Sequence, residues 1–207
     1  MTITNEDNME LMARYEDNYF DLAIVDPPYG IGAGSKKFIN GSSKTVKNYF
    51  RDNDWDVPPK KQYFEELIRV SKNQIIWGGN YFVEHLKNFR CFIFWDKTIH
   101  GNSYADGELA WTSFDKVARY YRKNIAQVTS EGRMHPTQKP VTLYEWLIMT
   151  YAKEGFRILD THLGSGSIAL ACHNLGYDLT ACELDQDYYE AAIKRIEQHK
   201  AQIRMFV

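Results

Sequence analysis

Short apolar runs recur along the chain, separated by helical segments or by polar loops. Six such runs are residues 20–25, 74–77, 91–95, 109–111, 156–159 and 179–182, and we interpret most of them as buried strands. Apolar residues recur with helical spacing in the segments 62–70, 141–151 and 187–199. Strands that alternate with helices predict an α/β fold with a mostly parallel sheet.

Local signals place the ends of two helices. Thr142 and Glu145 have the spacing of a capping box at the start of the segment 141–151. A further helix is expected to begin at Gly164 and Gly166 and to end at Gly176, which can adopt the left-handed conformation of a helix cap. Residues 156–182 would then form one βαβ unit.

The chain has 207 residues, 44% of them hydrophobic, so it can bury one sizeable core, and we predict a single domain over residues 1–207. A formal net charge of -2 gives the molecule no long-range positive field. Nucleic acid would therefore have to be bound by local clusters of basic residues. We predict one such cluster in a basic loop, residues 35–51, with Lys36, Lys37, Lys44, Lys47 and Arg51.

The cysteines and the N-terminus indicate an intracellular setting. Cys91, Cys172 and Cys182 lie in apolar stretches without the spacing of a zinc site, so we expect reduced core thiols and no metal. Residues 1–10 lack the features of a signal peptide, and no segment has the length of a membrane span. We therefore expect a cytoplasmic protein without membrane contact.

A glycine-rich turn joins a predicted strand to a predicted helix, with the sequence Asp160-Thr161-His162-Leu163-Gly164-Ser165-Gly166. Together with Ala169 it fits the nucleotide-binding pattern G-x-G-x-x-[GA], in which the glycines let a ligand approach the backbone. Glu183 ends the next predicted strand, where an acid can accept hydrogen bonds from both ribose hydroxyls. A turn that merely connects strand and helix is the alternative, and the position of Glu183 favours a cofactor that carries a nucleoside.

A proline-rich turn directly follows the predicted strand 20–25, with the sequence Asp26-Pro27-Pro28-Tyr29-Gly30. The prolines fix the backbone, so the Asp26 carboxylate and the Pro27 carbonyl can accept the two hydrogens of an amino group while Tyr29 stacks on the attached base. Such a pocket suits a flipped-out nucleobase. Taken alone, the turn fits an ordinary loop about equally well, but the glycine-rich turn in the same chain favours the base pocket.

A third motif, His135-Pro136-Thr137-Gln138-Lys139-Pro140, precedes the predicted helix 141–151 and is locally explained as a helix-entry loop. In this order the three motifs resemble the β-class DNA amino methyltransferases, over nearly the whole chain. The resemblance implies a Rossmann-like, S-adenosylmethionine-dependent methyltransferase fold that is circularly permuted, with a mostly parallel sheet and an antiparallel edge hairpin. In that family Asp-Pro-Pro-Tyr is typical of adenine-N6 enzymes and Ser-Pro-Pro-Tyr of cytosine-N4 enzymes. Adenine N6 is therefore favoured, with cytosine N4 as an alternative.

The resemblance also implies which residues form the site. The catalytic residues would be Asp26, Pro27, Pro28 and Tyr29. The residues expected at S-adenosylmethionine are Asp7, Asp26, Thr137, Lys139, Asp160, Thr161, His162, Gly164, Ser165, Gly166 and Glu183. Residues 5–8 would end an opening strand that neighbours the Glu183 strand, and Asp7 would lie near the cofactor's adenine.

The chain departs from the family pattern in two places. It has Asp160-Thr161-His162 where the family usually has Asp-Pro-Phe, and titration of His162 could make cofactor binding pH-dependent. Only the short segment 115–134 is left for target recognition, so sequence discrimination should be weak or delegated. In that segment Arg119, Arg122 and Lys123 flank two tyrosines, which suits DNA phosphates and stacked bases, with a solvated hairpin as an equal alternative.

The sequence thus predicts direct methyl transfer to adenine N6 of double-stranded DNA, with positioning as the enzyme's main task. Because one small domain covers little DNA, we also expect a homodimer. Three alternatives stay open: a methyltransferase that acts on RNA or on a protein amide, a dinucleotide-dependent dehydrogenase, and a non-catalytic DNA-binding subunit. The dehydrogenase leaves Asp26 to Tyr29 unexplained, and the intact motifs speak against the subunit. The biological role, restriction-modification, phage defence or regulation, is left open.

Overall fold

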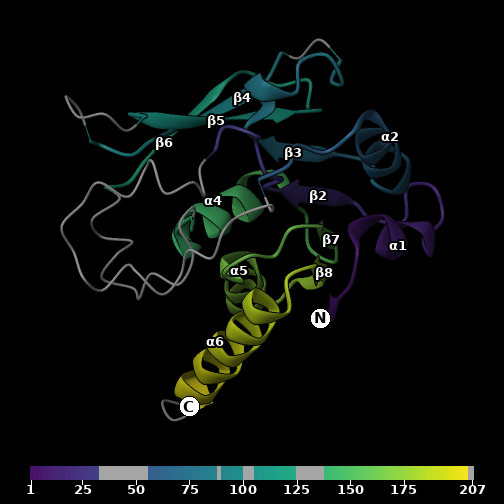
Figure 1. Cartoon of the computed structure of the whole chain (residues 1–207). Coiled ribbons are helices and arrows are strands. Elements are labelled where there is room, and N and C mark those ends of the chain that lie inside the picture. Colours follow the sequence, from purple (N-terminus) through teal and green to yellow (C-terminus); the bar gives the residue numbers. More distant parts are fainter. Residues whose placement is uncertain (33–55, 88–89, 100–104, 125–137, 205–207) are drawn as a thin grey trace.

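The computed structural model describes residues 1–32, 56–87, 90–99, 105–124 and 138–204, and an eight-stranded sheet forms its centre (Figure 1). The strands are β1 (Thr2–Asn5), β2 (Leu22–Val25), β3 (Gln74–Trp77), β4 (Phe92–Asp96), β5 (Gly107–Thr112), β6 (Arg119–Arg122), β7 (Arg157–Asp160) and β8 (Asp178–Glu183). The helices are α1 (Asn8–Ala13), α2 (Lys61–Val70), the 3₁₀ helix η3 (Gly79–Tyr81), α4 (Val141–Tyr151), α5 (Ser167–Leu175) and α6 (Gln186–Arg204). The predicted basic loop 35–51, residues 125–134 and Thr137 lie outside the described residues.

The strand order is β1-β8-β7-β2-β3-β5-β4-β6, and β5 pairs antiparallel with both β3 and β4. The remaining pairs are parallel, so the predicted mostly parallel α/β sheet is confirmed. The antiparallel hairpin was predicted at the edge of the sheet, and this position is wrong, because β6 lies outside it and pairs parallel with β4.

Strand β6 has no apolar run that would mark it in the sequence, since it reads Arg-Tyr-Tyr-Arg and three of its four residues are exposed. Tyr121 packs against the core, and its hydroxyl lies 3.0 Å from Oγ1 of Thr142 in α4. A strand of aromatic residues anchored on one side is common at the edge of a sheet. The described part of the segment 115–134 thus contains an exposed edge strand, and residues 125–134 lie outside the described residues.

Helices cover both faces of the sheet (Figure 1). Two separate clusters of buried apolar side chains fill the space between the helices and the sheet. Ile24 of β2 points into the cluster under α4, α5 and α6, whereas Ala23 and Val25 point into the cluster under α1 and α2. This alternation follows from the two-residue period of a strand. The result is a three-layer α/β/α arrangement, as expected for parallel strands joined by helices.

The ends of two helices test the capping predictions. Helix α5 ends at Gly176, which has a φ of 73° in the left-handed region, as predicted. The capping box at α4 is wrong, because Pro140 is the N-cap and Thr142 lies inside the first turn. The hydroxyl of Thr142 instead accepts a hydrogen bond from Lys123 Nζ at 2.8 Å.

Cys91, Cys172 and Cys182 are buried free thiols, as predicted. Within the described residues, no helix is both long and apolar enough to cross a membrane.

Two features of the sheet bring the sequence motifs together. Strands β2 and β7 are parallel neighbours, with Leu22 opposite Ile158, so the turns that follow them open at the same edge. Strand β1 lies beside β8 with Asn5 opposite Glu183, as expected for an opening strand next to the Glu183 strand. The carboxyl edge of this part of the sheet is where α/β folds bind ligands.

Candidate functional site

A cavity of about 580 Å³ lies at this edge, within the usual size range of small-molecule sites. Its walls come from the turn after β2, the turn after β7, the end of β8 and the start of α2, and include Asp26, Tyr29, Tyr63, His162, Gly164 and Glu183. The structure therefore brings the proline-rich turn and the glycine-rich turn together around one space. A smaller cavity of about 40 Å³ adjoins Asp26, Lys139, Ser165 and Gly164.

The carboxylate of Glu183 is held by backbone amides on two sides. Oε2 accepts the N–H of Gly164 at 2.8 Å, and Oε1 accepts the N–H of Asp185 at 3.1 Å. Burial raises the pKa of Glu183, and the bond from Gly164 partly offsets that effect. Each carboxylate oxygen has a second lone pair, so this fixed group can still accept two hydroxyl groups from a ligand.

The glycine-rich turn packs tightly against the rest of the fold. Gly166 has a φ of 73°, and a Cβ there would press on Ala192 and Ile196 of α6. Ser165 is buried, and its carbonyl accepts a hydrogen bond from Arg195 at 2.9 Å. A side chain at position 166 would therefore strain the backbone, and the end of the Ile196 side chain would have to shift slightly.

His162 is held in the neutral form by its surroundings. Its Nε2 lies 3.2 Å from Asn8 Nδ2, its Nδ1 lies 3.0 Å from Thr161 Oγ1, and its ring meets that of Tyr63 edge-on. Desolvation lowers the pKa of His162 to about 4. Titration of His162 should therefore not make cofactor binding pH-dependent near neutral pH, in contrast to the expectation from the sequence.

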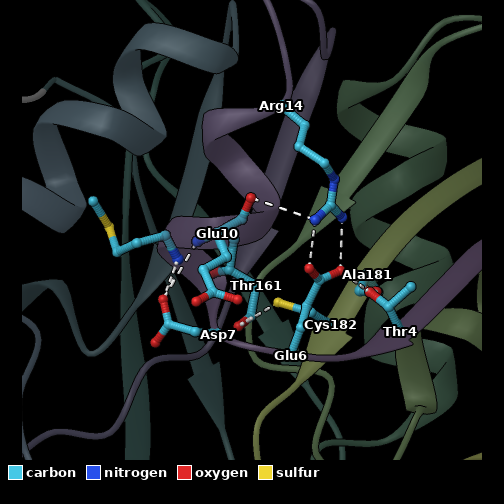
Figure 2. Close-up of polar contacts among 9 residues, drawn as sticks. Thr4, Glu6, Asp7, Glu10, Arg14, Thr161, Ala181 and Cys182 are labelled. Carbon is cyan, nitrogen blue, oxygen red and sulfur yellow. Dashed lines mark hydrogen bonds and ion pairs between the residues drawn. The ribbon is translucent and has the colours of Figure 1, made fainter.

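Two acidic residues directly follow β1, and each has its own hydrogen-bond partners (Figure 2). Asp7 caps α1, because its Oδ1 accepts the N–H groups of Met9 and Glu10. Glu6 binds Arg14 through both carboxylate oxygens, and this hydrogen bonding lowers its pKa to about 2. Glu6, Asn8 and Met9 line the cavity, whereas Asp7, expected near the cofactor, is not among the lining residues.

Asp160 lies beneath the cavity rather than in its wall. It is buried, and its Oδ1 accepts the N–H of His162 at 3.0 Å. Burial raises the pKa of Asp160 to about 8. Its hydrogen bond with the His162 amide holds the backbone of the glycine-rich turn in place. The hydroxyl of the next residue, Thr161, hydrogen-bonds the Tyr63 hydroxyl at 2.7 Å.

Asp26 and Tyr29 contact each other inside the proline-rich turn. The Tyr29 hydroxyl donates to Oδ1 of Asp26 at 2.7 Å. The ring of Tyr29 lies stacked on Tyr81, with centroids 5.1 Å apart, and packs so closely on Gly78 that a Cβ there would overlap it. Gly78 also has a φ of 68°, which favours glycine. The turn thus presents a carboxylate and an aromatic ring to the cavity in a fixed arrangement.

Lys139, expected beside the cofactor, lies at the Asp26 carboxylate. Its ammonium contacts Oδ2 of Asp26 and lies 2.9 Å from Oε2 of Glu108. Burial opposes its charge, but the two carboxylates overcome that effect and raise the pKa of Lys139. Lys97 completes the cluster at 2.6 Å from Oε1 of Glu108.

The two acids of this cluster differ in their pKa. Burial raises the pKa of Asp26, and the charge of Lys139 opposes this shift. Burial also disfavours ionised Glu108, but Lys139 and Lys97 outweigh it and hold the pKa of Glu108 at about 2. The sequence analysis missed Glu108 and Lys97. The available signals were Glu108 directly before the apolar run 109–111 and Lys97 two residues after the run 91–95.

The described basic residues proposed for DNA contact have different surroundings. Arg119 is exposed on β6. Arg122 binds Asp96 at 3.1 Å and lies over the ring of Tyr120, whereas Lys123 binds Thr142. Lys36, Lys37, Lys44, Lys47 and Arg51 lie outside the described residues.

Comparison with known proteins identifies relatives along most of the chain. The sequence family N6_N4_Mtase, described as DNA methylase, matches residues 20–194. The type II methyltransferase M2.DpnII of Streptococcus pneumoniae is 23% identical over 95% of this chain and 90% of its own length.

Two solved structures have a similar fold. The M1.HpyAVI–SAM complex superposes with a TM-score of 0.60 at 20% identity, covering 94% of this chain and 98% of that one. The cytosine-N4-specific PvuII DNA methyltransferase also reaches 0.60, at 11% identity, covering 97% and 91% of the two chains. At these identities the likeness concerns the fold.

Proposed function

The chain belongs to the N6_N4_Mtase family of DNA methylases, and on this premise we propose that it transfers a methyl group from S-adenosylmethionine to adenine N6 in double-stranded DNA. One observation carries the proposal: Asp26 and Tyr29 share a single cavity with Gly164 and Glu183. The carboxylates that we assign to the target amino group and to the cofactor's ribose, those of Asp26 and Glu183, thus line the same space. Aspartate at the first position of the tetrapeptide favours adenine over cytosine.

The residues present fit S-adenosylmethionine. The two oxygens of Glu183, fixed by the amides of Gly164 and Asp185, suit the two ribose hydroxyls. Leu184 and Tyr188 supply apolar surface in the same wall for an adenine ring. The cofactor, when bound, supplies an electrophilic sulfonium methyl group. These residues would bind and orient it toward Asp26.

The chain's own contribution to the reaction is positioning. Asp26 and the Pro27 carbonyl would accept the two hydrogens of the amino group, which directs the nitrogen lone pair into the cavity. Tyr29 would stack on the base and hold its plane. The nitrogen can then attack the methyl carbon directly as the methyl–sulfur bond breaks, with no covalent bond between enzyme and base. S-adenosylhomocysteine would be the leaving group, and the methylated nitrogen would give up one proton to Asp26 or to water.

Cytosine N4 is the second candidate. The family's name covers both amino groups, and the PvuII enzyme with a similar fold is cytosine-N4-specific. An exocyclic amino group on a planar ring presents the same two hydrogens in both bases. The choice therefore rests on the first residue of the tetrapeptide, Asp26.

For DNA, we propose contact through Arg119 on β6 and through the basic segment 35–51, since phosphate contacts supply most non-specific affinity. A homodimer would extend the surface available to the duplex, and light scattering of the purified protein tests this. Cytoplasmic location would follow from a DNA substrate in a bacterial cell.

The test is transfer of labelled methyl from S-adenosylmethionine to unmethylated genomic DNA, to the same DNA denatured, and to structured RNA. We expect label in duplex DNA, and a loss of at least about 100-fold in Asp26→Asn. Asp17→Asn, the same change at an exposed position away from the cavity, serves as the matched control. Label in RNA alone, or in no nucleic acid, contradicts the proposal.

A further inference from the structure

We propose that Glu108 is a positioning residue of this site, which takes over the hydrogen bond of the Tyr29 hydroxyl when the amino group of the target base binds Asp26. The inference rests on the proposed function and deepens it. It concerns residues of three elements: Asp26 after β2, Glu108 in β5 and Lys139 before α4.

Both oxygens of Asp26 are already engaged. The Tyr29 hydroxyl donates to Oδ1 at 2.7 Å, and the Lys139 ammonium contacts Oδ2. Oδ1 has a second lone pair, but an amino group held there would share the oxygen with the hydroxyl, and each of the two hydrogen bonds would weaken the other. A second acceptor for that hydroxyl would remove the competition.

Glu108 supplies such an acceptor. Its Oε2 lies 3.4 Å from the Tyr29 hydroxyl oxygen and 2.9 Å from Lys139 Nζ. A rotation of the hydroxyl hydrogen and a small approach of the two oxygens would turn this contact into a full hydrogen bond. The acceptor carries the same charge as Asp26, so the hydroxyl loses little by changing partner.

The number of charges argues against a purely structural role. The side chains of Lys139, Asp26 and Glu108 are 1%, 16% and 18% exposed. Asp26 alone would neutralise Lys139, yet Glu108 adds a second negative charge, which Lys97 then balances at 2.6 Å. Buried ion pairs contribute little to stability relative to apolar residues. The extra pair of Glu108 and Lys97 is therefore better explained by a function at Asp26 than by stabilisation of the fold.

The experiment is a double-mutant cycle on methyl transfer to duplex DNA, with Glu108→Gln, Tyr29→Phe and the double variant. Gln preserves shape but is a weaker, uncharged acceptor, so we expect Glu108→Gln to lower kcat by about 10-fold or more with little change in KM for either substrate. In the Tyr29→Phe background there is no hydroxyl to move, so the same change should cost less than about threefold. An equal loss in both backgrounds overturns the inference.

Two further measurements separate this role from damage to the fold. Glu108→Asp keeps the charge beside Lys139 and Lys97 but withdraws the acceptor from Tyr29, so it should lower kcat as Glu108→Gln does, and full activity overturns the inference. Calorimetric affinity for S-adenosylhomocysteine should stay within about twofold of wild type in each Glu108 variant. Glu84→Gln, at an exposed acid, is the matched control. A wild-type protein without any transfer would instead overturn the proposed function itself.

Discussion

The Nζ of Lys139 donates a hydrogen bond to Oδ2 of Asp26, across a sequence separation of 113 residues. The contact joins the loop before α4 to the turn after β2, and Glu108 shares the same ammonium at 2.9 Å. Burial and the charge of Glu108 raise the pKa of Asp26, and Lys139 opposes them. The charge of Asp26 therefore depends on a residue far away in the sequence.

Removing this cation should shift the pH dependence of the reaction. In Lys139→Met, burial and the repulsion from Glu108 are opposed only by the hydrogen bond from Tyr29, so the pKa of Asp26 rises. If ionised Asp26 is the active form, the acidic limb of the kcat–pH profile should move to higher pH by at least about one unit. Lys200→Met, at a lysine on α6 that binds Glu197, is the control. An unmoved limb would show that Lys139 does not set the charge of Asp26.

Glu183 should contribute strongly to cofactor affinity. Replacing it by Gln removes the charge and one acceptor oxygen, so one ribose hydroxyl loses its partner. We expect affinity for S-adenosylhomocysteine, measured by calorimetry, to fall by about 10-fold or more. Glu190→Gln, at an exposed acid on α6, should bind as wild type does. Equal affinities of the two variants would place the ribose elsewhere.

His162 should act as a neutral ring. Because desolvation lowers its pKa to about 4, it carries no charge near neutral pH. His162→Phe should keep the affinity for S-adenosylhomocysteine within about threefold between pH 6 and pH 8. A wild-type affinity that changes with an inflection near pH 6.5, and a variant without it, would contradict this account.

Asp160 should make the fold less stable at high pH. Its pKa is raised from 3.8 to about 8 in the folded protein, so the folded state holds the proton to a higher pH than the unfolded chain does. The stability from this group is complete below about pH 4 and declines as the pH rises to about 8. Asp160→Asn keeps an acceptor for the His162 amide and does not titrate.

We therefore expect the Tm advantage of Asp160→Asn over wild type to be larger at pH 9 than at pH 5, by at least about 3 °C. Calorimetry at the two pH values measures it. A difference in Tm that is the same at both would show that Asp160 stays ionised in the folded protein.

The strands and the place of the two turns could be predicted from sequence because both depend on local pattern. Buried parallel strands are continuous apolar runs, and the turns that follow them lie at the carboxyl edge. Strand β6 was missed because Arg119 and Arg122 interrupt any apolar run. Its contacts with the rest of the fold come from Tyr121 on α4 and from Tyr120 and Arg122 at Asp96, which lie far apart in the sequence. The α4 cap failed because Pro140 already sets the start of the helix.

The charge cluster could not be predicted, since it depends on pairs far apart in the sequence. Nothing near Glu108 indicates that its carboxylate meets Lys139, and only the position of β5 in the sheet brings them together. The environment of His162 was also hidden, because its low pKa depends on Asn8 and Tyr63 packing around the ring. Side-chain charge states follow from tertiary packing, which motifs do not encode.

The central claim is that the site around Asp26 methylates adenine N6, and nucleoside analysis tests it most directly. Unmethylated duplex DNA is incubated with S-adenosylmethionine and either the wild-type protein or Asp26→Ala, digested to nucleosides, and analysed by mass spectrometry. The account predicts N6-methyladenine with the wild-type protein and none with the variant. N4-methylcytosine in its place, or N6-methyladenine that persists in Asp26→Ala, would contradict it.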